Sequence, residues 1–276
     1  MIYYAPTTLK EFNKYCQAHD NISILAGGTD ILPRWQSDSS IKPKVLVDIK
    51  KMNELNSIQY SDKEIIIGAL TTIQELKIDP IIQQEFSALS QSAREFAGVQ
   101  IRHRATIGGN ICNASPAGDL IPSLYVYNAV IEIAGSKGKK RISIQKFITG
   151  VGQTALKKDE IVINIILPKS NEKSIFYKLG LRQSMAISVI NFAIAYELDG
   201  NGRWKSLKIA AGSVAPTVAS LTTFANALCD GNNVDESIQL VDNDISPIDD
   251  IRASSNYRRS VLKNVLKFTI KEIYVG

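Results

Sequence analysis

Short apolar runs alternate with amphipathic segments through the N-terminal part of the chain. Apolar residues at helical spacing from Thr8 to Ala18 predict a helix capped by Thr7 or Thr8. Runs rich in isoleucine, leucine and valine predict strands at Ile22–Ala26, Val45–Ile49, Glu64–Ala69, Val130–Ala134, Arg141–Ile144 and Glu160–Leu167. Further helices are expected at Thr72–Lys77, at Leu120–Tyr127, and at Phe86–Ala97 with Gly98 at its C-terminal end.

The C-terminal third has a different pattern. Two long apolar segments, Ile187–Leu198 and Leu207–Ser213, flank the turn Asp199–Gly202 and predict an antiparallel hairpin. Helices are expected at Thr217–Cys229, at Val234–Val241, and from Ser254 or Ser255 to about Tyr274. The last helix has an apolar stripe wide enough to be buried. The stripe consists of two adjacent rows of apolar residues: Tyr257, Val261, Val265 and Phe268 form one row, and Leu262, Leu266 and Ile270 form the other. The polar segment Lys169–Lys173 marks a boundary, and the fold class is α+β.

Two glycine pairs, each at the end of an apolar run, carry the candidate chemistry. They are Gly27-Gly28, followed by Thr29, and Gly108-Gly109, preceded by Thr106. Glycine permits backbone angles closed to other residues and leaves no side chain between main-chain N–H groups and a bound anion. Each threonine adds a hydroxyl donor suited to phosphate oxygens. One such loop could equally be a tight turn, but two predict a diphosphate held from both sides, and so a dinucleotide cofactor.

The surroundings of the pairs narrow the type of site. Neither pair is a G-x-G-x-x-G motif or a P-loop, because no Lys-Ser/Thr follows the glycines, so a nucleotide triphosphatase is disfavoured. Asp30 could cap the following helix or bond a neutral ligand group, whereas it would repel a phosphate. The second loop continues into Ala114–Asp119, which adds an acid within a short distance.

Composition excludes several classes of protein. The chain has 276 residues, 45% of them hydrophobic, and a mild net charge of +5, which disfavours nucleic-acid binding. Its three cysteines stand far apart with no C-x-x-C, and it has two histidines, so no metal site is expected. The start of the chain lacks a secretory pattern and no apolar run reaches membrane-spanning length, so a soluble cytoplasmic protein is predicted. No nucleophile–base pair or carboxylate pair stands out, so no catalytic residue is assigned.

Taken in order, these segments resemble the FAD-binding (medium) subunit of molybdenum hydroxylases, the family of xanthine dehydrogenase, carbon monoxide dehydrogenase and aldehyde oxidoreductase. The resemblance covers nearly the whole chain and rests on the order of its segments rather than on any one of them. Those segments are Leu25–Asp30, Gln100–Arg102, Thr106–Asn110, Ser115–Asp119, Asp159–Val162, Tyr177-Lys178, Ala211–Pro216, Ile251-Arg252 and Tyr257-Arg258.

The resemblance implies a fold and a role. The fold would be of the vanillyl-alcohol-oxidase type, with a FAD-binding domain at residues 1–172, divided into subdomains at about 1–56 and 57–172, and a C-terminal domain at 173–276 made of a small antiparallel sheet packed with helices. The chain would carry non-covalent FAD and take electrons from [2Fe-2S] clusters in a small partner subunit. A large partner subunit would hold the molybdenum cofactor and oxidise the substrate, with an aldehyde slightly preferred over carbon monoxide, a purine or another heterocycle. The external electron acceptor would be NAD, oxygen, a quinone or a protein carrier.

Candidate cofactor-binding residues come from the glycine segments and from matching family positions. Matching position implies a ribityl or ribose hydroxyl contact for Asp119 and places Val162 and Lys178 near the flavin ring, where a cation by N1 and O2 would stabilise reduced, anionic flavin. A solvated lysine at a strand edge is the alternative for Lys178. The full set is Ile24, Leu25, Ala26, Gly27, Gly28, Thr29, Asp30, Thr106, Ile107, Gly108, Gly109, Asn110, Asp119, Val162 and Lys178.

The chain departs from the family pattern at His103, where relatives commonly have asparagine; a surface or interface histidine is the expected reading. Cys112 is expected to be a small buried residue rather than a redox thiol. Two other functions stay open at this stage: a stand-alone FAD-dependent alcohol oxidase of the same fold, and a scaffold subunit that has lost its flavin.

Overall fold

The computed structural model describes residues 1–182 and 185–275. It has two compact units, each built from segments that are separated in the sequence. The first unit contains Met1–Leu76, Gly98–Ala114 and Asn128–Lys169, and the second contains Lys77–Ala97, Ser115–Tyr127 and Ser170–Gly276. The linear division of the chain at residues 172 and 173 stays a prediction of its domain organisation.

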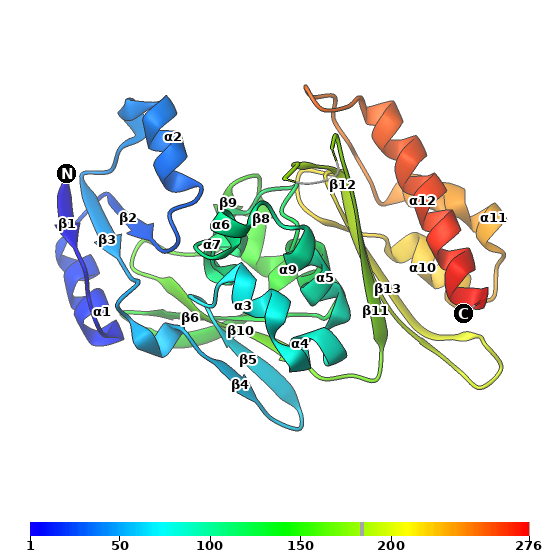
Figure 1. Cartoon of the computed structure of the whole chain (residues 1–276), viewed down its shortest axis with the longest axis horizontal. Coiled ribbons are helices and arrows are strands. Elements are labelled where there is room, and N and C mark those ends of the chain that lie inside the picture. Colours follow the sequence, from blue (N-terminus) through cyan, green and yellow to red (C-terminus); the bar gives the residue numbers. More distant parts are fainter. Residues whose placement is uncertain (183–184, 276) are drawn as a thin grey trace. The chain divides into compact units, whose positions relative to one another are not determined.

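A parallel three-stranded sheet with the order β1-β3-β2 begins the first unit (Figure 1). Its central strand is buried on both faces, as expected for a parallel strand covered on both sides. Helix α1 packs on the core through Phe12 and Cys16, which are both buried. Its N-cap is Thr8, whose Oγ1 accepts a hydrogen bond from the Glu11 N–H at 3.2 Å. The elements here are β1 (Ile2–Tyr4), α1 (Leu9–Ala18), β2 (Ile22–Leu25), α2 (Ile31–Ser37), η1 (Ser39–Ile41), β3 (Val45–Asp48) and η2 (Asn53–Leu55).

A five-stranded antiparallel sheet follows in the same unit, with the order β4-β5-β10-β6-β7. The two strands predicted at Val130–Ala134 and Arg141–Ile144 correspond to β6 and β7, which pair as an antiparallel hairpin. Short helices and a small hairpin complete the unit, and α7 packs on β10. The elements are β4 (Ile58–Tyr60), β5 (Glu64–Gly68), α3 (Ile73–Ile78), α6 (Val99–Arg102), α7 (Ile107–Asn113), β6 (Val130–Gly135), β7 (Gly138–Ser143), α9 (Ile144–Phe147), β8 (Ile148–Gly150), β9 (Gln153–Thr154) and β10 (Ile161–Pro168).

The second unit is a four-stranded antiparallel sheet, β11-β12-β13-β14, with helices on both faces. The α10 and α12 helices cover one face, as Figure 1 shows, and α5 and α8 pack against the other. The predicted β12–β13 hairpin is confirmed. The elements are α4 (Pro80–Glu85), α5 (Ser87–Glu95), α8 (Ile121–Val126), β11 (Lys173–Gly180), β12 (Ser188–Leu198), β13 (Trp204–Gly212), β14 (Ala219–Ser220), α10 (Thr222–Cys229), α11 (Val234–Ser237), η3 (Ile238–Asn243) and α12 (Ser255–Val275).

Three helix predictions need correction. Helix α5 ends at Glu95, and Ala97 takes the left-handed conformation (φ 38°), while Gly98 is the N-cap of the next helix rather than a C-terminal stop. Helix α10 starts at Thr222, because Ala219 and Ser220 pair with β13 as a short strand. In the segment predicted as one helix at 234–241, α-helix gives way to 3₁₀-helix after Ser237.

The buried stripe of α12 is narrower than the sequence suggests. Leu262, Leu266 and Ile270 are fully buried in the core of the second unit, but Phe268 is 63% exposed and Tyr257 is 50% exposed. A helix that packs on a sheet from one side buries one i, i+4 row and leaves the flank of the neighbouring row in solvent. No helix in the described part of the chain combines the length and the apolar character needed to cross a membrane.

Candidate functional site

The first glycine loop leaves strand β2 and presents unused backbone donors. Gly28 has φ +75°, a conformation that favours glycine, and Gly27 is buried. Within the described chain, none of the amide N–H groups of Gly27, Gly28 and Thr29 donates to a protein acceptor. Three consecutive unpaired amides are donors available to a ligand such as an anion.

The two glycine loops adjoin within the first unit. A Cβ placed on Gly27 would lie 1.9 Å from the backbone oxygen of Arg104 and 3.1 Å from the Cα of Ala105, immediately before Thr106. Only a glycine permits so close a backbone approach. The contact explains Gly27 through packing, and it brings the segments predicted to share one ligand next to each other.

The second glycine pair has a different geometry from the one expected. It lies in the first turn of α7, whose N-cap is Thr106. The first four amides of α7 are already used. Those of Ile107 and Gly108 donate to the carbonyls of Thr71 (3.0 Å) and Ala69 (2.9 Å). Those of Gly109 and Asn110 donate to the Oγ1 (3.1 Å) and the carbonyl oxygen (2.9 Å) of Thr106. The expectation that the amides of Gly108–Asn110 are available to a diphosphate is therefore wrong for this structure.

Gly108 is required by packing rather than by an anion or by a positive φ. A Cβ there would lie 2.7 Å from the Ala69 backbone oxygen, whereas a Cβ on the exposed Gly109 would meet only the Thr106 Oγ1, at 3.0 Å. The groups that remain for a ligand at this loop are side chains. The Thr106 hydroxyl proton has no acceptor among the described residues, so this hydroxyl can still donate.

Two buried polar atoms beside the second loop lack a partner. They are the Asn110 Oδ1 and the Thr71 Oγ1, and Thr71 is 1% exposed. Buried side-chain oxygens are normally hydrogen-bonded, so unpaired ones point to a group that the protein does not itself supply. Asn110 was among the predicted residues; Thr71 was not, although it lies in the short connection between β5 and the capped helix α3. Their chemistry fits a polar ligand such as a dinucleotide.

The remaining predicted residues of this unit are in the apolar core or at the surface. Ile24, Leu25 and Ala26 join the apolar packing around β2, and Val162 is buried in β10 next to a bulge. Asp30 is at the N-cap position of α2 but makes no capping hydrogen bond, and it is paired with Arg34 at 3.4 Å on the surface.

In the second unit, Asp119 and Lys178 form a buried ion pair. The Lys178 Nζ lies 2.6 Å from Asp119 Oδ2, and the two side chains are 6% and 9% exposed. The same ammonium donates to the Glu95 carbonyl at 3.0 Å, so one of its three protons has no acceptor in the described chain. A solvated strand-edge lysine is therefore excluded for Lys178.

Sequence reasoning missed two partners of that pair. Ser188 Oγ donates to Asp119 Oδ1 at 2.6 Å, and Asn191 Nδ2 donates to the same oxygen at 3.1 Å. Both residues are fully buried. The only signal in the sequence was two polar residues inside the otherwise apolar run of β12.

Other potentially reactive groups are inert or dispersed. Burial raises the pKa of the Cys112 thiol to about 12, which is unsuited to thiolate chemistry at neutral pH, and His103 is exposed at the end of α6. Among the described residues, no cluster of histidine, cysteine or acidic side chains could hold a metal ion.

The Thr106 cap gives a matched test of this loop. We expect Thr106→Val to lower the free energy of unfolding by about 1 kcal/mol, the usual cost of losing an N-cap, and to weaken the retention of a bound dinucleotide. Thr8→Val removes a comparable cap from α1 and should lower stability similarly while leaving retention unchanged. Denaturant unfolding and cofactor content of both variants check this; equal retention in the two would remove Thr106 from the site.

Two family models match this chain over almost its whole length. The family described as the FAD-binding domain in molybdopterin dehydrogenase matches residues 1–170, and the C-terminal domain of the CO dehydrogenase flavoprotein matches residues 175–273. The xanthine dehydrogenase FAD-binding subunit of Escherichia coli O157:H7 is 32% identical over 278 residues, covering 98% of this chain and 94% of the relative. The nicotinate dehydrogenase FAD-subunit of Eubacterium barkeri is 34% identical over 219 residues, covering 75% and 72%.

A solved structure of carbon monoxide dehydrogenase from Hydrogenophaga pseudoflava superposes with a TM-score of 0.90 at 26% identity, over 97% of this chain and 94% of that one. The α+β fold and the FAD cofactor expected from the sequence are thereby confirmed. The chain belongs to the family of FAD-binding subunits of molybdenum hydroxylases.

Proposed function

We propose that this chain is the electron-exit subunit of a molybdenum hydroxylase complex. It would receive electrons from [2Fe-2S] clusters of a small partner subunit and pass them to an external acceptor, while a large subunit oxidises the substrate at molybdenum. The observation that carries the proposal is the meeting of the two glycine loops, one of which presents three unpaired amides. A cytoplasmic location and the expected heterotrimeric assembly belong to the same proposal.

In the first unit, the amides of Gly27–Thr29 and the Thr106 hydroxyl would bind the diphosphate oxygens, because they are the donors that the protein leaves unused. The unpaired oxygens of Asn110 and Thr71 would accept hydrogen bonds from hydroxyl or amide groups of the cofactor. The buried Val162 would supply apolar contact to the ring.

In the second unit, the Asp119–Lys178 pair would serve the flavin end of the cofactor. The remaining proton of the Lys178 ammonium suits an acceptor of the ring, and Asp119 would bind a ribityl or ribose hydroxyl. When bound, FAD supplies the redox chemistry, and the chain needs only to bind, orient and tune it. That division of labour agrees with the lack of a catalytic residue among the sequence motifs.

Substrate choice would lie in the large subunit, and the named relatives span purine, pyridine and aldehyde chemistry. A xanthine dehydrogenase, a nicotinate dehydrogenase and the glyceraldehyde dehydrogenase of Sulfolobus acidocaldarius all have a chain similar to this one. The aldehyde preference stays part of the proposal.

An absorbance spectrum of the purified chain tests the proposed function. We expect a flavin spectrum with about one FAD per chain, released intact by acid or heat, and reduced only when iron–sulfur and molybdenum partners are added with substrate. A colourless chain that takes up no added FAD would favour the scaffold alternative. Reduction of the flavin by an alcohol with no partner present would favour the stand-alone oxidase.

A further inference from the structure

The first residues of β12 contain a β-bulge. Leu179 of β11 pairs with Ile190, but the next residue, Gly180, pairs with Ser188, so Val189 is the extra residue. In a regular strand, residues 188 and 191 would face opposite sides of the sheet, because side chains alternate. A bulge re-aims a side chain, and here both Ser188 and Asn191 donate to Asp119 Oδ1.

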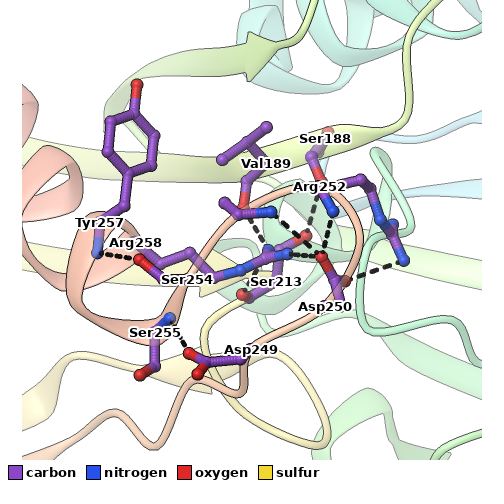
Figure 2. Close-up of polar contacts among 11 residues, drawn as sticks. Ser188, Val189, Ser213, Asp249, Asp250, Arg252, Ser254, Ser255, Tyr257 and Arg258 are labelled. Atoms are coloured by element: carbon purple, nitrogen blue, oxygen red, sulfur yellow. Dashed lines mark hydrogen bonds and ion pairs between the residues drawn. The ribbon is translucent and has the colours of Figure 1, made fainter.

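Arg258 of α12 binds the backbone of this bulge (Figure 2). Its Nη1 donates to the Val189 carbonyl at 2.5 Å and to the Ser213 carbonyl at 3.1 Å, and its Nη2 donates to Asp250 Oδ1 at 2.7 Å. The Arg258 side chain is 3% exposed. The buried guanidinium therefore has a charge partner and supplies a donor to the extra residue of the bulge, whose backbone groups a bulge leaves out of the regular ladder.

The carboxylate that clamps Arg258 is itself fixed. Figure 2 shows Asp250 Oδ1 between the guanidinium and the turn that follows it, where it accepts the N–H groups of Arg252 at 2.8 Å and Ala253 at 3.3 Å. Ser213 Oγ in turn donates to the Ser188 carbonyl at 3.2 Å. The backbone carbonyls of Ser188 and Val189 thus each accept a side-chain hydrogen bond, and Arg258 also binds Ser213, the donor to Ser188.

These contacts end at the buried ion pair. Asp119 Oδ2 accepts a hydrogen bond from Lys178, and Asp119 Oδ1 accepts hydrogen bonds from Ser188 and Asn191. The serine hydroxyl therefore offsets part of the carboxylate charge on Oδ1, the oxygen that does not contact the lysine. Without that hydroxyl, more of the negative charge acts on the ammonium, and the carboxylate loses the shortest contact on Oδ1.

We propose that Ser188 and Arg258 are positioning residues for Lys178: Arg258 holds the bulge, the bulge turns Ser188 to Asp119, and Asp119 fixes the lysine beside the flavin ring. This inference rests on the proposed function, in which Lys178 tunes the flavin.

Three variants of the full chain loaded with FAD test it: Ser188→Ala, Arg258→Lys and the control Ser174→Ala. Ser174 is also a buried serine of the same sheet, 5% exposed and hydrogen-bonded to Tyr127 at 2.6 Å, but it does not touch Asp119. The readouts are the FAD dissociation constant from fluorescence titration and the two-electron midpoint potential. We expect Ser188→Ala and Arg258→Lys each to weaken the binding of reduced flavin relative to oxidised flavin about tenfold. For a two-electron couple this lowers the midpoint potential by about 30 mV. Ser174→Ala should leave the midpoint potential unchanged.

The outcomes separate the two claims. If wild-type protein binds FAD but Ser188→Ala matches Ser174→Ala in potential, the positioning role is overturned and the proposed function stands. A wild-type chain that binds no FAD overturns both. Should Arg258→Lys fail to fold, Asp250→Asn weakens the same clamp while keeping the guanidinium, and an unchanged potential there removes Arg258 from the inference.

Discussion

Replacement of Gly27 by valine is expected to abolish FAD retention and to lower the free energy of unfolding by more than about 3 kcal/mol. Overpacking of a tight core usually costs about 1–3 kcal/mol, and the clash here is with backbone that cannot rotate away. The added Cβ alone would lie 1.9 Å from the Arg104 carbonyl oxygen, so the two glycine loops would have to separate. Flavin absorbance per chain and a denaturant unfolding curve measure the two effects.

Gly200→Ala is the matched control for this prediction. Gly200 is also in a turn, but a Cβ there would meet no atom within 4 Å, and no positive φ requires glycine. Its FAD content and stability should equal those of the wild type. If Gly27→Val kept one FAD per chain in a folded protein, the meeting of the loops would not be what holds the cofactor.

The sequence predicted most of the elements of the fold because their signals are local. The Thr8 cap, the apolar period of α1 and the Asp199–Gly202 turn between β12 and β13 each depend on residues close together in the chain. Two helix ends were predicted wrongly because other factors overrode local propensity. The left-handed conformation of Ala97 lies just beyond the end of α5. The pairing of Ala219–Ser220 with β13, a tertiary contact, delays the start of α10.

The two glycine loops could be found from the sequence, but the contacts that surround them could not. Both glycine pairs were visible, yet the reason for Gly108 is its contact with Ala69, a residue remote in the chain. The use of the α7 amides by Thr71, Ala69 and Thr106 could not be predicted either, because it depends on how β5 and α7 meet. The role of Ser188 could not be predicted either, because regular alternation of side chains would place it on the other face of the strand from Asn191. Only the register shift between β11 and β12 brings both side chains to the same carboxylate.

The burial of the Asp119–Lys178 pair leads to the other large effect. Lys178→Met removes the charge at nearly constant length and leaves Asp119 buried without its counterion. Breaking a buried pair from one side costs about 3–5 kcal/mol, so we expect a loss in the free energy of unfolding of that size. If FAD is bound, its midpoint potential should also fall, because the cation no longer favours the reduced form.

Two further variants show whether the loss comes from the uncompensated charge. Adding Asp119→Asn to Lys178→Met removes the second charge while an amide oxygen still accepts from Ser188 and Asn191, so the double variant should regain most of the stability. Lys205→Met breaks the pair with Glu197, where the lysine is 63% exposed, and should cost less than about 1 kcal/mol. Equal losses in Lys178→Met and Lys205→Met would mean that Lys178 is solvated after all. If Lys178 is buried in solution, the stability of the second unit depends on the ion pair between Lys178 and Asp119, whether or not FAD is bound.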